Sequence, residues 1–541
     1  MSYGTYLPPT PTNEPVRRYA PGDAHRAILE AEIDRQAAES IEIPLVIGGR
    51  EVRTGNTQEI VMPHDHGHVL GTFHQAGAAE VAAAADAAMQ AKHDWEALPW
   101  NERAAVFLRA ADLLAGPWRD RVNAATMLGQ SKTCHQAEID AACELIDFFR
   151  FNVHFAKQVY EEQPESSPGV WNRLEHRALD GFVLAVTPFN FTSIAGNLPS
   201  APALLGNVAL WKPSSTSLLS NWYLMQMFRE AGLPDGVINF LPGPGGAIGN
   251  AVFADRRFAG LHFTGSTNTF QTIWKSIADN IGNYAQYPRL VGETGGKDFV
   301  FAHPSADARS LAVALLRGAF EYQGQKCSAA SRAYVPKSLW KEVREILVDE
   351  LAQVRMGDVR DFSNFVGAVI DARAFGEHKA AIEAAKSAKD AEVVAGGQCD
   401  DSRGWFVQPT VIETTNPDYA TMKTELFGPI LTVHPYEEGD LEEALEHCAN
   451  GSEYALTGAI FAQDRHVIRK LTDRLRFAAG NFYVNDKPTG AVVGQQPFGG
   501  SRASGTNDKA GSILNLLRWV SPRTIKETFV PPTDWRYPFL E

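Results

Sequence analysis

Short apolar runs alternate with helix-like stretches from residue 181 onward, and this alternation leaves few folds open. The runs have the length of single strands and carry few polar residues, which is typical of strands buried on both faces. Four such runs lie at Phe182–Val186, Val208–Trp211, Val237–Leu241 and Leu261–Phe263. Periodic stretches separate them at Asn197–Leu205, Leu218–Glu230 and Asn268–Ala278. The pattern predicts a parallel sheet with helices on both sides.

A second alternating region begins near residue 298 and continues to about residue 485. The chain has 541 residues, which exceeds the roughly 250–300 residues at which a single core stops growing. We therefore expect two α/β units. The residues before 181 predict a helix over 24–39, a hairpin over Ile43–Arg53, and helices over 77–96, 101–115 and 135–161.

The net charge of −14 argues against general binding to nucleic acids or acidic membranes. The five cysteines are odd in number and show no CxxC spacing, so we expect neither a disulfide framework nor a metal site. The sequence has no signal peptide pattern and no run of about 18 apolar residues. These features predict a cytoplasmic protein.

Cys327 and Glu293 are the candidate chemical groups. Cys327 lies among small and cationic neighbours, and Glu293 is surrounded by glycines in Gly292–Lys297. A thiolate can attack a carbonyl, and a carboxylate can activate the water that releases a thioester. We expect the adjacent Lys326 to favour the thiolate. The alternative is that Cys327 is a small buried residue and Glu293 a solvated turn residue.

Three segments in the first unit are candidates for a nucleotide site. The glycine-rich Gly243–Ile248 follows a strand, but Ile248 stands where the third glycine of the dinucleotide fingerprint belongs, so we interpret it as a turn. Gly265 and Ser266 follow another strand and begin a helix, where free backbone N–H groups can hold pyrophosphate. Lys212 ends a third strand and can reach ligand hydroxyls.

Seven motifs occur in one order along the chain. They are Thr187–Phe191, Trp211–Pro213, Phe263–Ser266, Gly292–Lys297, Gln325–Cys327, Glu425–Pro429 and Pro497–Gly500. In identity and order they resemble those of the NAD(P)-dependent aldehyde dehydrogenase family, over roughly residues 40–525. The resemblance implies a Rossmann-type cofactor domain, an α/β catalytic domain and a small β oligomerisation element.

The resemblance also implies roles for individual residues. Cys327 would attack the aldehyde, and the side-chain amide of Asn190 with the backbone N–H of Cys327 would hold the oxyanion. Hydride would then leave for the nicotinamide, and Glu293 would activate water to hydrolyse the thioester. The remaining implied roles concern the cofactor: Lys212 at the adenosine ribose, Gly265 and Ser266 at the pyrophosphate, and Glu425 and Phe427 at the nicotinamide ribose and ring.

Position 215 departs from the pattern of many relatives. They carry a glutamate there that binds the adenosine 2′-hydroxyl and repels a 2′-phosphate, whereas this chain has Ser215. We expect NAD as the cofactor, with weaker activity on NADP.

Further segments narrow the resemblance to one branch. Glu321–Ala329, Asn485–Ala491, Gly494–Gly500 and Ser504–Lys509 resemble the branch that oxidises glutamate-γ-semialdehyde, the open form of Δ1-pyrroline-5-carboxylate, to glutamate in proline degradation. Its substrate carries a carboxylate at the far end from the aldehyde. Backbone N–H groups at Gly490 and Ala491 with the Ser328 hydroxyl would bind that carboxylate, and Phe191 and Phe498 would enclose the aliphatic chain.

The implied domain boundaries follow from the same resemblance. Residues 1–159 and 181–290 form the NAD-binding domain, and residues 291–500 form the catalytic domain. A hairpin near 160–180 and the tail 501–541 form the oligomerisation element. The alternating tail Leu514–Val530 either adds a strand to a neighbouring subunit or packs on its own chain. We expect a homo-oligomer, a dimer or larger.

Three alternatives remain at this stage. The first is another semialdehyde dehydrogenase of the family, for example one acting on succinate semialdehyde. The second is a cysteine hydrolase, which would need an activating histidine, and neither His262 nor His303 shares a motif with Cys327. The third is an inactive binding or structural relative, which would lack Cys327, Glu293 or Asn190.

Overall fold

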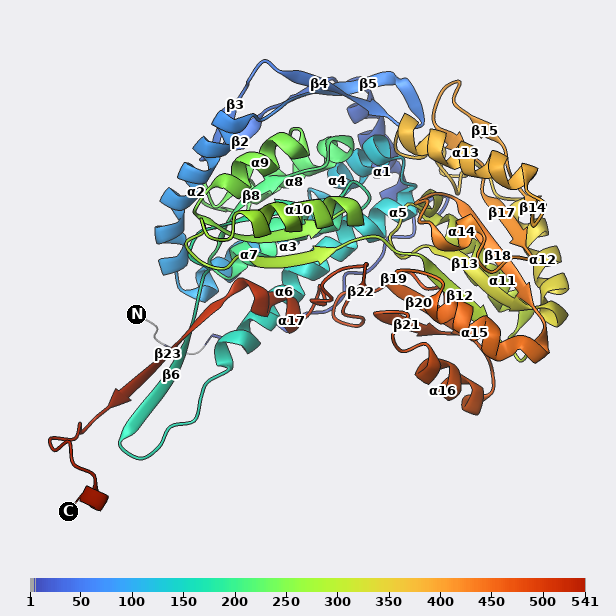
Figure 1. Ribbon diagram of the computed structural model, residues 1–541. Coiled ribbons are helices and arrows are strands. Elements are labelled where there is room, and N and C mark those ends of the chain that lie inside the picture. The colour runs from blue at the N-terminus through green and yellow to red at the C-terminus, as the bar shows by residue number, and fades with distance from the viewer. Residues whose placement is uncertain (1–3, 5, 541) are drawn as a thin grey trace.

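Two seven-stranded sheets lie side by side in the computed structural model, which describes residue 4 and residues 6–540 (Figure 1). The first sheet has the order β11-β10-β7-β8-β9-β2-β3, and the second has the order β14-β17-β18-β13-β12-β20-β21. The expected α/β class with two units is therefore confirmed.

The first sheet is parallel from β11 to β9 and ends in the antiparallel strands β2 and β3. Its strands are β2 Leu45–Ile47, β3 Arg50–Val52, β7 Phe182–Val186, β8 Val208–Lys212, β9 Ile238–Phe240, β10 Phe258–Thr264 and β11 Arg289–Glu293. The antiparallel β2 and β3 form the hairpin expected over Ile43–Arg53. The parallel strands are apolar because helices cover both faces of this sheet.

Eight helices of ten or more residues between residues 78 and 279 share one hydrophobic core with this sheet. They are α2 Ala78–Ala97, α3 Trp100–Ala115, α4 Arg119–Gln130, α6 Glu144–Glu161, α7 Thr192–Leu204, α8 Leu218–Glu230, α9 Gly245–Ala254 and α10 Thr267–Asp279. The helix expected over 135–161 is interrupted near its start. It consists of α5 Cys134–Ala137, the π-helical turn η1 Glu138–Cys143, and α6. The sequence did not predict α4.

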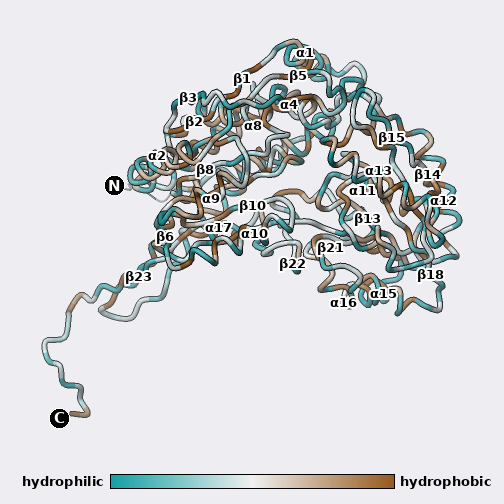
Figure 2. Tube along the Cα trace, turned by 45° about the horizontal axis from the view of Figure 1, so that its top comes forward, coloured by the Kyte–Doolittle hydropathy of each residue, from teal (hydrophilic) through white to brown (hydrophobic). Residues whose placement is uncertain are grey.

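The second sheet is parallel except for β14, and a separate cluster of buried residues lies on each face. Its strands are β12 Asp298–Ala302, β13 Ala330–Pro336, β14 Ala391–Ala395, β17 Thr410–Thr414, β18 Ile430–Tyr436, β20 Thr457–Phe461 and β21 Asn481–Val484. Its helices are α11 Ala308–Phe320, α12 Lys337–Leu351, α13 Ala372–Ser387, α14 Ala420–Lys423, α15 Leu441–Asn450 and α16 Arg465–Arg474. In Figure 2 the strands are largely hydrophobic, whereas α12 at the rim is mostly hydrophilic.

A long two-stranded ribbon projects from the first unit (Figure 1). It consists of β6 Val170–Arg177 and β23 Ser521–Thr528, which pair antiparallel along their full length. The hairpin expected within 160–180 is therefore wrong, because the partner of β6 comes from the C-terminal tail. Of the two alternatives for that tail, the structure shows β23 on its own chain.

The remaining elements are short. A three-stranded sheet holds β1 Ile41–Ile43, β4 Thr57–Met62 and β5 Asp65–His74, and α1 Ala24–Ala38 fits the helix expected over 24–39. Two small pairs are β15 Cys399–Asp400 with β16 Phe406–Val407, and β19 Tyr454–Ala455 with β22 Ser501–Arg502. The short helix α17 Ile513–Leu516 precedes β23. Within the described residues, no helix is long and apolar enough to cross a membrane.

Candidate active site

The loop that carries Cys327 lies at the junction of the two units. It follows the 3-10 helix η3 (Glu321–Gly324), in which Tyr322 and Gln323 adopt positive φ angles of 51° and 54°. This conformation is costly for residues other than glycine and needs support from outside the loop. The Tyr322 hydroxyl donates to the Gln130 carbonyl at 3.0 Å, and Gln323 Nε2 donates to the Ser131 carbonyl at 3.0 Å. Residues at the C-terminal end of α4 in the first unit thus fix the loop of the second.

Asn190 lies four residues after β7 and is buried. Its Nδ2 donates to the Gln325 carbonyl at 3.0 Å, two residues before Cys327. The Gln325 side chain in turn accepts from the Ile370 backbone N–H at 2.9 Å. The amide of Asn190 therefore lies beside the nucleophile loop, where the sequence predicted it.

Glu293 ends β11 and its carboxyl group is buried. Burial raises the pKa of this carboxyl to about 8, with Lys509 lowering it and Glu144 raising it further. Its Oε1 has no hydrogen-bond partner within the described part of the chain. A cavity of about 30 Å³ adjoins Glu293, Glu144, Lys509 and Phe498, which is enough for about one or two water molecules.

The surroundings of Cys327 favour its neutral thiol over the thiolate. Burial raises its pKa well above the ordinary value, and the nearby carboxyl groups of Glu293, Asp298 and Glu425 raise it further. The expectation that Lys326 favours the thiolate is not met. The Lys326 Nζ lies 3.3 Å from Asp140 Oδ2 and 3.9 Å from Glu321 Oε2, so the ammonium group forms ion pairs with these carboxylates instead.

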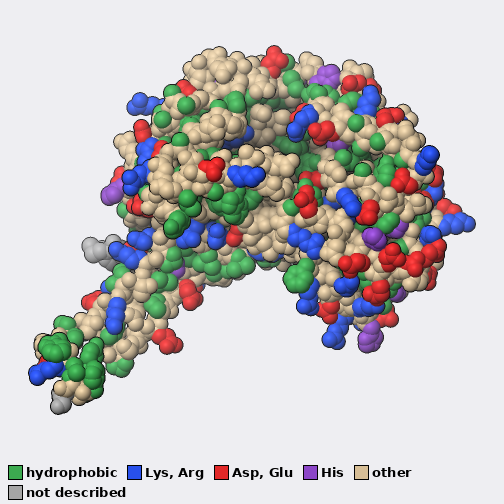
Figure 3. All heavy atoms as spheres, viewed as in Figure 1, with side chains coloured by type: hydrophobic (Ala, Val, Ile, Leu, Met, Phe, Trp, Pro, Cys, Tyr) green, Lys and Arg blue, Asp and Glu red, His purple; other side chains and the backbone are tan. Residues whose placement is uncertain are grey.

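One cavity of about 310 Å³ contains Cys327 together with all five residues predicted to bind the substrate. They are Phe191, Ser328, Gly490, Ala491 and Phe498. The Ser328 hydroxyl lies 2.8 Å from the Thr489 hydroxyl, which joins the nucleophile loop to the loop that carries Gly490. Figure 3 shows a recess between the part of the surface that carries α10 and the part that carries α13.

A second cavity, of about 360 Å³, lies at the carboxyl edge of the first sheet. Lys212 lines it together with Gly245 and Gly246 at the start of α9 and Thr269 in α10. Burial lowers the pKa of the Lys212 ammonium to about 8. The interpretation of Gly243–Ile248 as a turn is therefore wrong for most of the segment, because α9 begins within it at Gly245 and its first turn lines this cavity.

The other predicted cofactor residues adjoin this region without lining the cavity. Ser266 caps α10, and its hydroxyl accepts from the Thr269 N–H at 3.3 Å. Gly265 donates its N–H to the Glu293 carbonyl at 3.2 Å, which connects the ends of β10 and β11. Ser215 begins the short 3-10 helix Ser215–Ser217, three residues after Lys212.

Glu425 lies close enough to Cys327 to affect the pKa of its thiol, and Phe427 follows two residues later. Glu425 Oε1 accepts from the Gly296 N–H at 2.8 Å, and burial raises the pKa of this carboxyl to about 7. A Cβ atom at Gly295 would overlap the Glu425 carboxylate, so the close approach requires glycine. The ring of Phe427 packs edge-on against Phe189, with 5.8 Å between ring centroids.

Sequence reasoning missed Glu144, which lines the cavity of Cys327. Burial raises the pKa of its carboxyl to about 8, and it accepts a hydrogen bond of 2.5 Å from the Ser193 hydroxyl. The sequence did contain a signal for this residue, because Glu144 stands between the apolar segments Ala141–Cys143 and Leu145–Ile146. A carboxylate in an apolar helical stretch is rarely buried without a reason.

The chain is similar to known proteins over most of its length. A family model described as "Aldehyde dehydrogenase family" matches residues 51–525. The chain belongs to the aldehyde dehydrogenase family. The resemblance seen in the seven motifs is thereby confirmed.

Individual members of the aldehyde dehydrogenase family are similar over nearly the whole chain. The chain is 55% identical over 535 residues to the mitochondrial delta-1-pyrroline-5-carboxylate dehydrogenase of Dictyostelium discoideum, covering 98% of this chain and 96% of the relative. The human protein of the same name is 47% identical, covering 98% and 94%. A crystal structure of the delta-pyrroline-5-carboxylate dehydrogenase from Mycobacterium tuberculosis bound with NAD is 57% identical, has a TM-score of 0.97 and covers both chains fully.

Proposed function

We propose that this protein oxidises L-glutamate-γ-semialdehyde, the open form of Δ1-pyrroline-5-carboxylate, to L-glutamate with reduction of NAD, in the degradation of proline. The observation that carries the proposal is the single cavity in which Cys327 lies with Ser328, Gly490 and Ala491. This cavity holds both a nucleophile for the aldehyde of the substrate and hydrogen-bond donors for the carboxylate at the other end of the substrate. The relatives named after this substrate support the same conclusion.

The substrate's carboxylate needs hydrogen-bond donors that do not depend on a charged side chain. Gly490 has a φ of 92°, a conformation in which consecutive backbone N–H groups can turn toward one anion. The Ser328 hydroxyl adds a donor beside them. Phe191 and Phe498 supply apolar walls for the methylene carbons between the two ends.

The reaction begins when the Cys327 thiol gives its proton to solvent water in the cavity and its sulfur bonds to the aldehyde carbon. The carbonyl oxygen then carries the negative charge, which the Asn190 amide and the Cys327 backbone N–H stabilise. Because Asn190 is buried and bound to the nucleophile loop, this donor is oriented before the substrate arrives. The resulting thiohemiacetal on Cys327 then loses hydride from the former aldehyde carbon and becomes a thioester; a dinucleotide held by the residues described below would supply the hydride acceptor.

Glu293 then acts as the general base. It takes a proton from water, the oxygen of that water adds to the thioester carbon, and the carbon–sulfur bond breaks to release glutamate and the Cys327 thiol. A carboxyl group with a pKa of about 8 is a far stronger base than a solvated one. The small cavity next to Glu293 has room for the attacking water.

The residues present suit a dinucleotide cofactor. Lys212 and the start of α9 face a cavity of about 360 Å³, and a Cβ atom at Gly246 would meet open space. Lys212 and Ser215 would hold the adenosine end, Gly265 and Ser266 the pyrophosphate, and Glu425 and Phe427 the nicotinamide end. Serine at 215 lacks the charge that repels a 2′-phosphate, so we expect weak activity on NADP beside NAD.

A substrate panel tests this proposal. NADH absorbance is followed with glutamate-γ-semialdehyde, succinate semialdehyde and pentanal, each with NAD and with NADP. We expect kcat/KM for glutamate-γ-semialdehyde to exceed that for pentanal by about one to three orders of magnitude, because pentanal leaves buried donors unpaired. Equal values for the three aldehydes would refute the carboxylate site, and a preference for succinate semialdehyde would change the substrate.

We further infer that the chain forms a homo-oligomer through the projecting ribbon and tail. Large apolar side chains there are exposed: Trp171, Phe529, Val530, Trp535, Tyr537 and Phe539. Figure 3 shows hydrophobic side chains gathered at the end of this projection. Light scattering coupled to gel filtration tests the inference on the full chain and on one ending at residue 520.

A cytoplasmic location stays a prediction, and several relatives are named mitochondrial.

A further inference from the structure

An extended N-terminal arm reaches the cavity of Cys327. The arm, defined here as residues 6–20, forms no helix or strand and lies against α4, η1 and α6. Asn13, Glu14 and Val16 line the same cavity as Cys327. The arm therefore forms part of the wall of the site, although it is far from the nucleophile in sequence.

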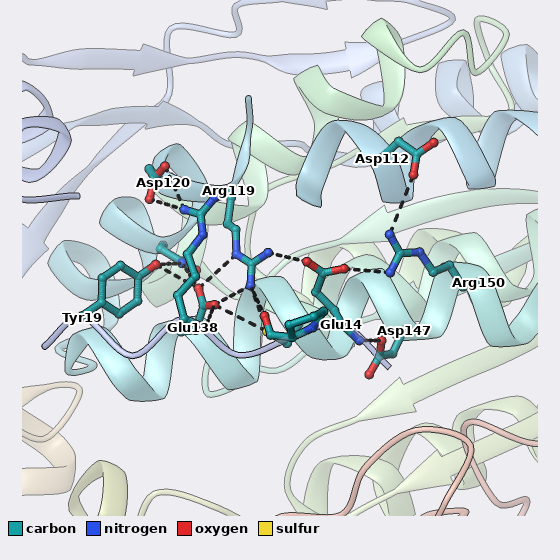
Figure 4. A network of polar contacts seen from close by, with 12 residues as sticks. Glu14, Tyr19, Asp112, Arg119, Asp120, Glu138, Asp147 and Arg150 are labelled. Atoms are coloured by element: carbon teal, nitrogen blue, oxygen red, sulfur yellow. Dashed lines mark hydrogen bonds and ion pairs between the residues drawn. The ribbon is translucent and has the colours of Figure 1, made fainter. Parts of the chain in front are cut away.

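Ion pairs fix the arm on the first unit. The Glu14 carboxylate accepts from Arg119 Nη1 at 2.5 Å and from Arg150 Nη1 at 2.7 Å, and Figure 4 shows it between these two side chains. Its backbone N–H donates to Asp147 Oδ1 at 2.7 Å. Arg119 also donates to the Pro15 carbonyl at 2.8 Å. Such shielded, charge-assisted bonds hold this part of the arm on α4 and α6.

Asn13 connects the fixed arm to a loop of the second unit. Its Nδ2 donates to Asp147 Oδ2 and to the Val493 carbonyl, both at 2.8 Å. Its Oδ1 accepts from Gln495 Nε2 at 2.9 Å. Both polar atoms of the amide are thus engaged: Nδ2 binds both α6 and the loop, and Oδ1 binds the loop.

That loop is the one that faces the nucleophile. We name residues 489–496 the anchor loop, since it begins at Thr489, beside Ser328, and includes Gly490 and Ala491. Hydrogen bonds within the anchor loop, such as that from the Val492 N–H to Gln496 Oε1 at 2.9 Å, stabilise only part of its conformation. Gly490 and Gly494 have positive φ angles of 92° and 81°, so its path contains two points of high conformational freedom.

We propose that Asn13 is a positioning residue that holds the anchor loop at the distance from Cys327 that the carboxylate-bearing substrate requires. The inference rests on the proposed function, since it concerns the far end of that substrate. Asn13 touches the loop three residues beyond Gly490, and a loop that is free to shift would misplace the backbone donors. The aldehyde end depends on Asn190 and Cys327, which contact neither Asn13 nor Gln495 through the bonds described.

The test compares Asn13→Ala with wild type on glutamate-γ-semialdehyde and on pentanal at saturating NAD. We expect KM for the semialdehyde to rise about fivefold to tenfold, the value of one or two hydrogen bonds, with kcat and the pentanal kinetics within about twofold. Gln495→Ala, at an exposed position, removes one of the same contacts and should produce a smaller shift of the same kind. The double variant should be less than additive, because both changes act on one link.

Arg17→Ala is the matched control. It removes another side chain that binds the arm, to Asp120 at 3.0 Å, but one remote from the anchor loop. We expect it to leave the ratio of kcat/KM values for the two aldehydes unchanged. Thermal unfolding of each variant monitors folding, and Gln495→Ala provides the test if Asn13→Ala does not fold.

The failures of the two proposals differ. If wild type does not prefer the semialdehyde over pentanal, the proposed function is wrong. If wild type has this preference and Asn13→Ala and Gln495→Ala keep it, or if both aldehydes lose efficiency equally, the positioning role of Asn13 is refuted while the proposed function stands.

Discussion

The side-chain amide of Asn190 donates a hydrogen bond to the Gln325 carbonyl, 3.0 Å away. This bond joins the carboxyl edge of the first sheet to the nucleophile loop of the second unit. Asn190→Ala removes both the bond and the proposed oxyanion donor. We expect kcat to fall by about 10² to 10³, the usual loss for one such donor. Steady-state kinetics at saturating substrate and NAD measure it, and a kcat within about threefold of wild type would exclude the role.

Cys327→Ala should abolish aldehyde oxidation. The variant keeps the cavity lined by Lys212, so NAD should still bind with about the wild-type affinity. Loss of turnover is followed by NADH absorbance, and binding is followed by calorimetry. Substantial turnover in this variant would rule out covalent catalysis, and lost NAD binding would show that the substitution disturbs more than the thiol.

Glu293→Gln should separate the two halves of the reaction. Acylation does not need the base in the proposed scheme, so a rapid burst of NADH of about one equivalent per active site should precede a slow steady state. The steady-state rate should fall by roughly 10² to 10⁴, the range for loss of a general base. Stopped-flow absorbance resolves the burst. A uniformly slow reaction without a burst would assign Glu293 to acylation instead.

The same carboxyl group makes the stability of the fold depend on pH. Burial raises the pKa of Glu293 from 4.5 to about 8, so between these values the folded state binds more protons than the unfolded state. The contribution of Glu293 to the free energy of unfolding therefore falls as pH rises, by at most about 1.4 kcal/mol per pH unit. Relative to Glu293→Gln, wild type should lose stability from pH 5 to pH 8. The free energy of unfolding of both proteins is measured by chemical denaturation at several pH values. If it changes with pH in the same way in wild type and in Glu293→Gln, the carboxyl group is not buried.

Gly295→Ala should weaken NAD binding. The added Cβ atom would overlap the Glu425 carboxylate, which the Gly296 N–H holds at 2.8 Å. We expect KM for NAD to rise about tenfold, with a loss of stability of roughly 1–3 kcal/mol from overpacking. Gly376→Ala in α13 is the control, because its Cβ would meet nothing within 4 Å. If Gly295→Ala and Gly376→Ala raise KM for NAD equally, the increase is not caused by the overlap with Glu425.

The sequence predicted the parts of the fold that follow apolar periodicity. Strands such as Phe182–Val186 were located because nearly every residue in them is apolar and buried. Helix α4 was missed for the opposite reason. It buries Asn123, Thr126 and Gln130, so it lacks an amphipathic pattern even though it lies inside the protein.

Contacts between segments that are distant in the sequence also could not be predicted. The direction of the Lys326 side chain depends on Asp140, which a sequence cannot place beside it. The segment Gly243–Ile248 was set aside for lacking a third glycine, although it holds the first turn of α9, which lines a cavity together with Lys212. In contrast, Cys327, Glu293 and Asn190 could be proposed as catalytic residues because motifs in a fixed order single them out without any distance information.

The pairing of β6 with β23 has a consequence for synthesis of the protein. Arg177 and Ser521, which face each other in the ribbon, are 344 residues apart. While a ribosome is still translating the second unit, β6 has already emerged and its hydrogen-bonding edges are exposed without their partner. The ribbon forms late, and a nascent chain that stalls before β23 exposes an unprotected strand to chaperones or to aggregation.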